Sequence, residues 1–262
     1  MKKKFLKPDV DIVEELSKKL FLANEELKNE KKLKDDMICN ISHDLRAPLT
    51  AIRSSIDYLN SSYDTISTSE LYNTLSILDS RTSILETLVN DLFYLISINS
   101  SNNNFHFENI DLTPVIEEYY CTLLSDNSFD ERKLFLECDA NQTLIANVDI
   151  TRILRVLDNL TTNAKKYSNK DDSITLGIKE DIKNNSIIVY VKDTGVGISK
   201  ENLNKIFERS YTVSSSRTPT SCGSGLGLAI VKEIILKHNG TVWCESTLNK
   251  GSSFYISLPK TN

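Results

Sequence analysis

The chain has 262 residues, of which 40% are hydrophobic and 26% charged, which is typical of a globular protein of about two domains. Its net charge of −5 argues against nucleic acid as a partner, because phosphate binding requires clustered cations. No apolar run approaches the roughly 18 residues of a membrane span, and no signal peptide follows the basic start. The five cysteines lack metal-ligand spacing and are expected to be reduced thiols. We therefore expect a cytoplasmic protein, with any membrane association supplied by a portion missing from this sequence or by a partner.

Residues 9–60 are predicted to form one long helix. Apolar residues recur at steps of three and four, the period of one helical face. Pro48 removes a backbone donor and should bend this helix. The upstream turns have the apolar seam of a coiled coil, so residues 1–35 are interpreted as an N-terminal coiled-coil helix. The positions that carry the central stripe are Ile38, Ile41, Leu45, Leu49, Ile52, Ile56 and Leu59.

A histidine lies on the opposite side of this helix. His43 is two residues from both Ile41 and Leu45, about 200° around the helix, so it should point away from the stripe. The Asp44 carboxylate can accept a hydrogen bond from the imidazole. This bond would fix the tautomer of the ring and raise the basicity of its other nitrogen. A solvent-exposed histidine is usually unremarkable, so its interpretation depends on the rest of the chain.

A second amphipathic helix follows, capped by Ser67 or Thr68. Two such helices joined by a short loop cannot bury both apolar stripes alone, and pairing with a second copy would give a four-helix bundle. Residues 36–100 are therefore predicted to form a dimerisation domain, and the polar residues 97–104 a linker.

Residues 105–262 are predicted to form a domain with mixed strands and helices, an α+β sandwich. A short strand near 108–112 leads into a helix capped by Asp111 or Thr113, and Asn184-Asn185 marks a hairpin turn. Further strands are expected at 133–138, 143–148, 174–179, 187–191, 241–246 and 253–258. Further helices are expected at 150–167, with Asp149 as N-cap, 200–207 and 225–238.

The helix at 150–167 has an unusual polar face. Asn159, Asn163, Lys166 and Tyr167 are spaced at i, i+4, i+7 and i+8, so they share one side of the helix. Two amides and an ammonium group suit a hydrated metal ion and phosphates. The apolar side of the same helix, which should pack inward, contains Ile153, Leu157, Leu160 and Ala164.

Two glycine-containing segments complete the candidate site. Asp193-Thr-Gly195-Val-Gly197 follows a strand, where glycines allow a flat ligand to approach and Asp193 can accept from an exocyclic amine. Residues 223–228 open a helix whose N-terminal amides favour phosphate. Neither segment has the G-x-G-x-x-G dinucleotide fingerprint or the P-loop pattern. A bound nucleotide would therefore lie in a different type of site.

In order and spacing, these segments resemble the cytoplasmic core of bacterial two-component sensor histidine kinases. Residues 42–49 resemble the H box, 159–167 the N box, 193–198 the G1 box, 207–211 the F box and 223–228 the G2 box. The resemblance covers residues ~9–260. It implies a HisKA-type dimeric antiparallel helical hairpin followed by a GHKL (Bergerat) α/β sandwich that binds ATP, with an ATP lid near 208–222.

The resemblance implies a role for each matched residue. His43 would be the phosphoacceptor, and Asp44 the acid that orients it and helps to take its proton. Asn163 would hold Mg²⁺ through an oxygen, with Asn159 assisting at the metal or phosphates.

The remaining matched residues would contact the nucleotide. Lys166 would contact phosphate, Tyr167 would stack on adenine, and Asp193 would accept from its amine. Arg209 or Arg217 would stabilise charge on the transferred phosphoryl group. The other nucleotide-binding positions would be Gly195, Gly197, Gly223, Gly225, Gly227 and Leu228.

The expected function is that of an ATP-dependent protein-histidine kinase, a homodimer that phosphorylates His43 and transfers the phosphoryl group to an aspartate of a response regulator. The alternatives are a GHKL-type ATPase and a phosphotransfer scaffold without autokinase turnover.

Four positions depart from the family pattern. Ala47 replaces the Thr or Asn that usually positions a water for dephosphorylation of the regulator, so phosphatase activity is in doubt. Ser210 replaces an aromatic residue of the F box. Asn239 and Asn249 stand where glycine is common, which is a mild change because Asn tolerates left-handed geometry.

Overall fold

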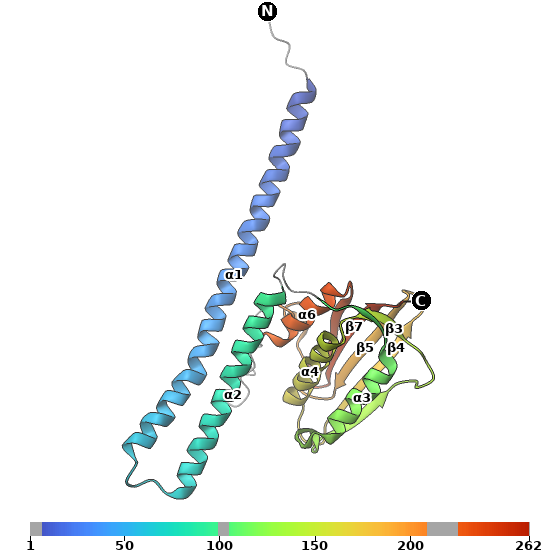
Figure 1. Ribbon diagram of the computed structural model, residues 1–262. Helices are drawn as coiled ribbons and strands as arrows, with labels where there is room; N and C mark the ends of the chain where they lie inside the picture. Colours follow the sequence, from blue (N-terminus) through green and yellow to red (C-terminus); the bar gives the residue numbers. More distant parts are fainter. Residues whose placement is uncertain (1–6, 99–104, 209–224, 262) are drawn as a thin grey trace, which may run out of the picture.

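The computed structural model describes residues 7–98, 105–208 and 225–261, which form a helical hairpin and an α/β unit (Figure 1). The linker predicted at 97–104 lies largely outside these ranges. So do most of the predicted lid and four residues named above, which are Arg209, Ser210, Arg217 and Gly223.

The hairpin consists of α1 (Lys7–Ser61) and α2 (Thr68–Ile98). The long first helix predicted from the sequence is confirmed, and it continues without a break through Pro48. A capping box starts α2: the Ser67 N–H donates to the Glu70 carboxylate at 3.0 Å, and the Glu70 N–H donates to the Ser67 hydroxyl at 3.3 Å. Of the two predicted caps, Ser67 is therefore the one used.

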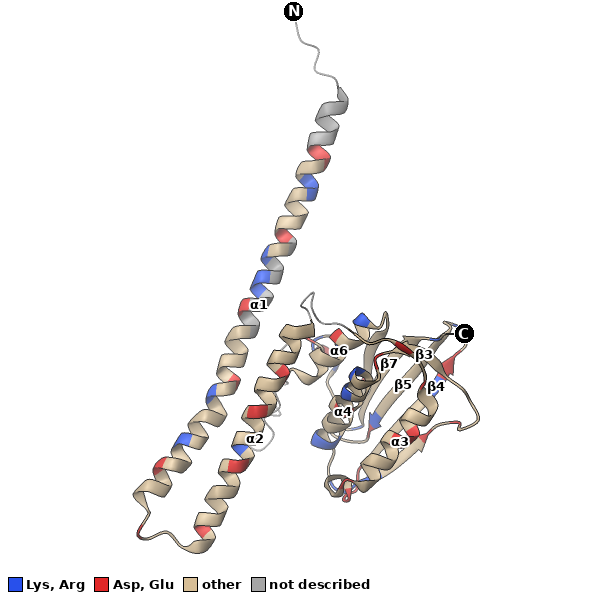
Figure 2. Cartoon of the chain, in the orientation of Figure 1, with Lys and Arg blue, Asp and Glu red and all other residues tan. Residues whose placement is uncertain are grey.

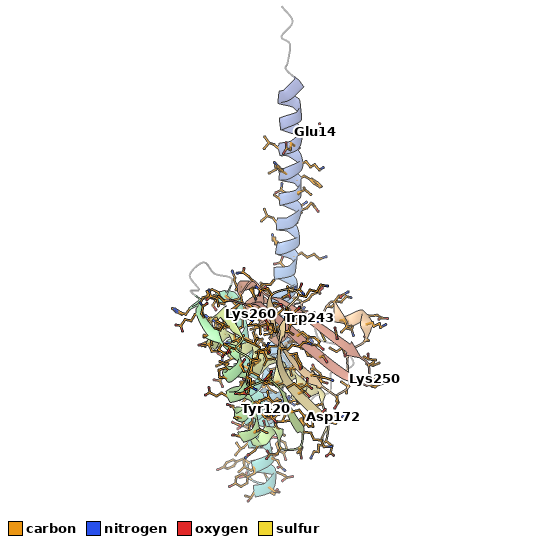
Figure 3. The ribbon with its side chains drawn as sticks, turned by 90° about the vertical axis from the view of Figure 1, so that its right-hand side faces the viewer. Glu14, Tyr120, Asp172, Trp243, Lys250 and Lys260 are labelled. Carbon is orange, nitrogen blue, oxygen red and sulfur yellow. The ribbon has the colours of Figure 1, made fainter. Side chains whose placement is uncertain are left out.

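The first turns of α1 extend beyond the end of α2 and stand clear of the rest of the chain around Glu14 (Figures 1 and 3). Charges of both signs are spread along α1 (Figure 2). Within the described ranges, no helix is long and apolar enough to cross a membrane.

The α/β unit has two sheets. A five-stranded sheet has the order β2-β4-β5-β7-β6, in which β2 and β4 are parallel and the other pairs antiparallel, and β1 pairs with β3 in a separate two-stranded sheet. The strands are β1 (Glu108–Asp111), β2 (Lys133–Glu137), β3 (Ile145–Val148), β4 (Ser173–Asp181), β5 (Ser186–Asp193), β6 (Thr241–Thr247) and β7 (Gly251–Pro259). The helices are α3 (Leu112–Ser125), η1 (Asn127–Phe129), α4 (Ile150–Tyr167), α5 (Lys200–Leu203) and α6 (Gly227–Lys237).

Helices α3, α4 and α6 cover one face of the large sheet (Figure 1). The alternate residues of β4, β5 and β7 that face these helices form the buried core, including Leu176, Val189 and Ile256. The hairpin predicted at Asn184-Asn185 joins β4 to β5, with Asn185 at φ 48°. This arrangement confirms the predicted α+β sandwich.

The opposite face of the sheet has a row of aromatic side chains. Trp243, labelled in Figure 3, stacks on Tyr255 with ring centroids 5.1 Å apart. Tyr190 extends across Gly177, and its hydroxyl donates to the Glu137 carboxylate. Any Cβ at Gly177 would collide with the Tyr190 ring, so glycine allows this contact between β5 and β2.

Several predicted boundaries are wrong. The helix predicted at 200–207 is helical only over α5 and then turns, because Ile206 and Phe207 pack into the core, where Phe207 meets Phe254 edge-on. Helix α6 begins at Gly227, after Gly225 at φ 61°, and the strand predicted at 143–148 begins at Ile145.

The two asparagines at positions where the resemblance predicts glycine both have left-handed backbones. Asn239 follows α6 at φ 56°, and Asn249 joins β6 to β7 at φ 61°. Since Asn tolerates this geometry, the two substitutions fit the fold as expected.

Candidate functional site

Helix α4 supplies the polar row of the candidate site. Its N-cap is Asp149, as predicted, whose carboxylate accepts from the Arg152 N–H at 3.2 Å. The predicted inward side is buried, while Asn159, Asn163, Lys166 and Tyr167 are only partly buried. The helix thus fixes one polar face beside a packed core.

The side chain of Asn159 connects α4 to the start of α6. Its amide nitrogen donates to the Arg155 carbonyl at 2.9 Å, which leaves its oxygen directed towards Gly227. A Cβ at residue 227 would lie 2.7 Å from that oxygen. Glycine at this position therefore lets the first turn of α6 approach the polar row.

Asp193 lies at the end of β5 and is 4% exposed. Its Oδ1 accepts from the Gly195 N–H at 2.8 Å. Burial raises the pKa of this carboxyl group to about 6, although hydrogen bonds from the Gly195 and Ser252 backbone oppose that increase. A buried acceptor at a glycine turn suits an amine donor of a flat ligand.

The turn after β5 is packed against the C-terminus of α4. The Val196 N–H donates to the Tyr167 carbonyl at 3.1 Å, and a Cβ at Gly195 would collide with that carbonyl. Gly197, at φ 68°, passes just as closely to the Thr247 carbonyl. These contacts bring Asp193 and its glycines to the end of the polar row.

Two further residues predicted for the nucleotide site are described nearby. The Lys166 ammonium group is 4.9 Å from the Tyr167 ring centroid, in cation–π range. The Leu228 side chain packs against the hydrophobic core, so its backbone amide, in the first turn of α6, is the group available to a phosphate. The structure thus gathers α4, the turn after β5 and the start of α6 around one site.

The donors of this site fit a magnesium ion that is bound mainly by a ligand. Within the described residues, no group of three or more His, Cys, Asp or Glu side chains could hold a metal. The polar row offers amide oxygens from Asn159 and Asn163. Mg²⁺ typically keeps several waters and binds through few protein oxygens plus substrate phosphates, so this set of donors is compatible with it.

His43 lies on the hairpin, separate from these residues. Its side chain is 67% exposed, and its Nδ1 is 3.3 Å from the Asp44 carboxylate. Ile41 on the opposite side of the helix is 6% exposed, which confirms the predicted orientation. The imidazole is therefore accessible and oriented by a neighbouring acid.

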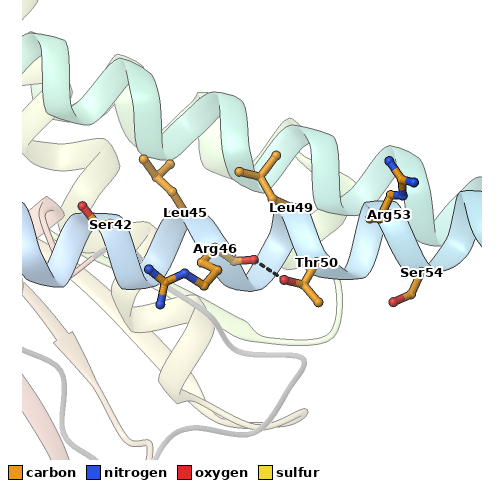
Figure 4. A pocket seen from close by; sticks show the side chains of 7 residues that line it. All are labelled: Ser42, Leu45, Arg46, Leu49, Thr50, Arg53 and Ser54. Atoms are coloured by element: carbon orange, nitrogen blue, oxygen red, sulfur yellow. Dashed lines mark hydrogen bonds between the residues drawn. The ribbon is translucent and has the colours of Figure 1, made fainter.

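A shallow pocket of about 450 Å³ lies along α1, and its lining includes Ser42, the residue before His43 (Figure 4). Leu45 and Leu49 point towards α2, whereas Arg46 points away from it (Figure 4). The residues that line the pocket are Ser42, Leu45, Arg46, Leu49, Thr50, Arg53 and Ser54. Sequence reasoning did not find this pocket, although the helical spacing of Arg46, Thr50 and Arg53 was a usable signal.

Comparisons with known proteins match both parts of the chain. Residues 33–101 match the family described as the His Kinase A (phospho-acceptor) domain. Residues 148–262 match the family described as histidine kinase-, DNA gyrase B- and HSP90-like ATPase.

Individual relatives agree with these matches. The sensor protein kinase WalK of Staphylococcus saprophyticus is 33% identical over 226 residues, which are 86% of this chain and 36% of WalK. A WalK of Staphylococcus aureus, also 33% identical, is covered to 53% of its length. The chain thus spans between one third and about half of the curated relatives that it matches.

Solved structures have the same fold. Histidine kinase ThkA in complex with the response regulator protein TrrA has a TM-score of 0.71 and 26% identity, over 93% of this chain and 67% of that one. The catalytic domain of ThkA alone has a TM-score of 0.51 and 30% identity, over 60% of this chain and 97% of that one.

Proposed function

The chain belongs to the sensor histidine kinases, and we propose that it is an ATP-dependent protein-histidine kinase that phosphorylates its own His43. The phosphoryl group would then pass to an aspartate of a response regulator. One observation carries this proposal: the chain combines an exposed, acid-oriented histidine on a hairpin with a polar row, a buried carboxyl group and a helix start that suit ATP.

Three segments of the chain would have separate roles in this reaction. Residues 1–35 would form the signalling helix, residues 36–100 the dimerisation and phosphotransfer domain, and residues 105–262 the ATP-binding domain. The four cysteines described are free, which supports a reducing, cytoplasmic location.

The arrangement at His43 supports attack on a phosphoryl group. When Nδ1–H donates to Asp44, the Nε2 lone pair is free to attack the γ-phosphorus. A P–N bond forms, the bond to the bridging oxygen of ADP breaks, and Asp44 stabilises the positive charge that develops on the ring. Phosphoryl transfer depends mainly on such positioning and on charge stabilisation.

The ATP site would bind each part of the nucleotide separately. Asp193 would accept from the adenine amine, beside the Tyr167 ring. Lys166 and the first amides of α6 would bind the phosphates. Asn163, assisted by Asn159, would hold Mg²⁺, which would neutralise phosphate charge when bound.

The partners would be a second copy of the chain and a response regulator. The ThkA–TrrA complex supports this type of partner. Because Ala47 lacks a side chain that could position a water, we expect weak dephosphorylation of the regulator.

Labelling with [γ-32P]ATP tests the proposal. Wild type should acquire acid-labile label, whereas His43→Gln and Asn163→Ala should not. His106→Gln is the matched control, because His106 is another exposed histidine and should be dispensable. Label that persists in His43→Gln would refute the assignment of the phosphoacceptor.

The same experiment separates the alternatives. A GHKL-type ATPase would release ADP without labelling itself. A phosphotransfer scaffold would neither hydrolyse ATP nor label itself, but it would accept label from a phosphorylated regulator. Transfer of label from His43 to a regulator would complete the evidence for a kinase.

A further inference from the structure

An ion pair joins the hairpin to the ATP-binding part. Asp91 lies near the end of α2, and its Oδ1 accepts from the Arg155 Nη2 of α4 at 3.0 Å. The Asp91 side chain is 12% exposed and that of Arg155 is 32% exposed. Because the pair is partly shielded from water, solvent screens its attraction less than that of a fully exposed surface pair.

An aromatic ring reinforces this ion pair. The Arg155 guanidinium group is 3.6 Å from the centroid of the Tyr94 ring, and that of Arg152 is 5.0 Å from it. Arg152 also lies 5.2 Å from the Phe105 ring, at the start of the ATP-binding part. Two arginines of α4 are thus held by the same α2 side chain.

The end of α2 is also anchored by apolar packing. Leu95 and Ile98 are each 1% exposed, and α2 packs against α6 (Figure 1). The helices and strands of the ATP-binding part contact α1, which contains His43, only marginally. The ATP-binding part is therefore docked on α2, and not on the helix that holds its proposed target.

This docking uses the same face of α4 as the candidate nucleotide site. Arg152, Arg155, Asn159 and Asn163 follow one another at helical steps of three and four. The interface with α2 therefore begins one turn before the polar row. Movement of α4 away from α2 would carry the nucleotide residues with it as one rigid element.

We propose that Asp91, Tyr94 and Arg155 form a latch that holds the ATP-binding part on α2 and that must open before His43 is phosphorylated. This inference rests on the proposed kinase function. Removing one partner leaves the other charge poorly compensated in the closed state only, so it shifts the equilibrium towards the open state.

The test measures the initial rate of His43 labelling by [γ-32P]ATP in the full chain. Asp91→Ala, Arg155→Ala and Tyr94→Ala should each raise kcat about three- to tenfold, with the KM for ATP unchanged, because the latch controls a conformational equilibrium and not nucleotide binding. The charge swap of Asp91→Arg with Arg155→Asp should return the rate towards wild type.

Two matched controls separate the latch from general effects. Asp79→Ala removes an exposed acid elsewhere on α2 and should leave the rate unchanged. Tyr94→Phe keeps the ring and removes a buried hydroxyl that has no hydrogen-bond partner in the described structure, so it should also behave as wild type. Circular dichroism melts report whether each variant is folded.

A salt titration keeps the test decisive if a variant unfolds. Raising NaCl from about 50 to about 500 mM screens a partly exposed ion pair and should raise the wild-type rate. Folded Asp91→Ala should not respond. Unchanged or lower rates in the folded variants, or no wild-type response to salt, would overturn the latch. Absence of His43 label in every protein would instead overturn the kinase proposal.

Discussion

Asp193 is a buried carboxyl group whose charge should control nucleotide binding. Burial raises its pKa to about 6, so the group is mainly ionised at pH 7.5 and mainly protonated at pH 5.5. A carboxylate is a stronger acceptor for an adenine amine than a protonated acid. ATP affinity should therefore fall as the pH falls through about 6.

Isothermal titration of ATP analogues at pH 5.5 and 7.5 measures this effect. We expect affinity to be lower by about three- to fourfold at pH 5.5 in wild type, and we expect Asp193→Asn to bind weakly at both pH values. Glu245→Gln, which changes an exposed acid on β6, is the control. Equal affinity at the two pH values in wild type would show that Asp193 does not contact the base.

At Gly227 we expect a substitution to reduce activity without lowering stability much. A Cβ here meets the Asn159 oxygen at 2.7 Å, and this atom is the end of a side chain that can rotate. Gly227→Ala should therefore displace the Asn159 amide and reduce His43 labelling about tenfold or more. Its free energy of unfolding should change by less than about 1 kcal/mol, because alanine favours a helix.

Gly251 provides the contrasting variant. It has φ 97°, and a Cβ there would collide with the Asp193 backbone carbonyl. Gly251→Ala should lower stability strongly, because backbone cannot move aside as a side-chain amide can. Urea unfolding of the two variants, beside the labelling assay, checks both expectations. A large loss of stability in Gly227→Ala would refute the distinction.

The elements that sequence reasoning located well have strong local signals. Helix α4 has an Asp149 cap and one apolar side, and the turn between β4 and β5 has two asparagines, so periodicity and turn chemistry were sufficient. The end of α5 was missed because it depends on how Ile206 and Phe207 pack.

Contacts between distant residues could not be read from the sequence. The pair Asp91–Arg155 is separated by 64 positions, and Tyr190 reaches Glu137 over 53. Motif spacing did predict which segments of the ATP-binding part form the candidate site, because these motifs lie at the end of α4, after β5 and at the start of α6. The role of each residue in that site stays a prediction.

His238 joins three elements of the ATP-binding part. At the end of α6, its Nε2 accepts from the Asp149 N–H at 3.0 Å, and its Nδ1–H donates to the Ile234 carbonyl at 2.8 Å. Phe105 and Phe107 pack edge-on against its ring. Since both nitrogens are used, the bonded form is the neutral imidazole.

This packing gives the stability of the fold a defined pH dependence. Burial lowers the pKa of His238 below its ordinary value, opposed by the Ile234 carbonyl and Asp149. The unfolded chain therefore binds a proton first as the pH falls below about 6.5, and the free energy of unfolding decreases. His238→Gln should be less stable at pH 7.5 and should lose less stability on acidification.

Urea unfolding at pH 7.5 and 5.5 gives the loss of stability on acidification for wild type and for His238→Gln. The difference between the two losses is the contribution of His238. Asp193 has the opposite effect in wild type, because its raised pKa makes the folded state hold a proton more tightly. His106→Gln, at an exposed histidine in the same segment, is the control. Equal loss of stability in wild type and His238→Gln would contradict the assignment.

A single copy of the chain leaves much of the hairpin stripe uncovered. Leu49 is 50% exposed and Ile56 42%, and on α2 Leu71 is 37% and Leu75 47% exposed. In contrast, Ile41 of α1 and Leu88 of α2 are each 6% exposed within one copy. The exposed residues recur at helical spacing on each helix, and we propose that they form the surface that packs against a second hairpin.

Substitution of this surface tests the proposed homodimer. Leu71→Glu with Leu75→Glu places four charges in the interface of two copies, where each leucine would otherwise contribute about 1.5–3 kcal/mol. Sedimentation equilibrium at about 10 μM should then find a monomer, whereas wild type should be a dimer, since several kcal/mol is a loss of at least 1,000-fold in affinity. Tyr63→Glu, at an 82% exposed turn position, should remain dimeric. If the double variant is still a dimer, the interface between two copies does not include Leu71 and Leu75.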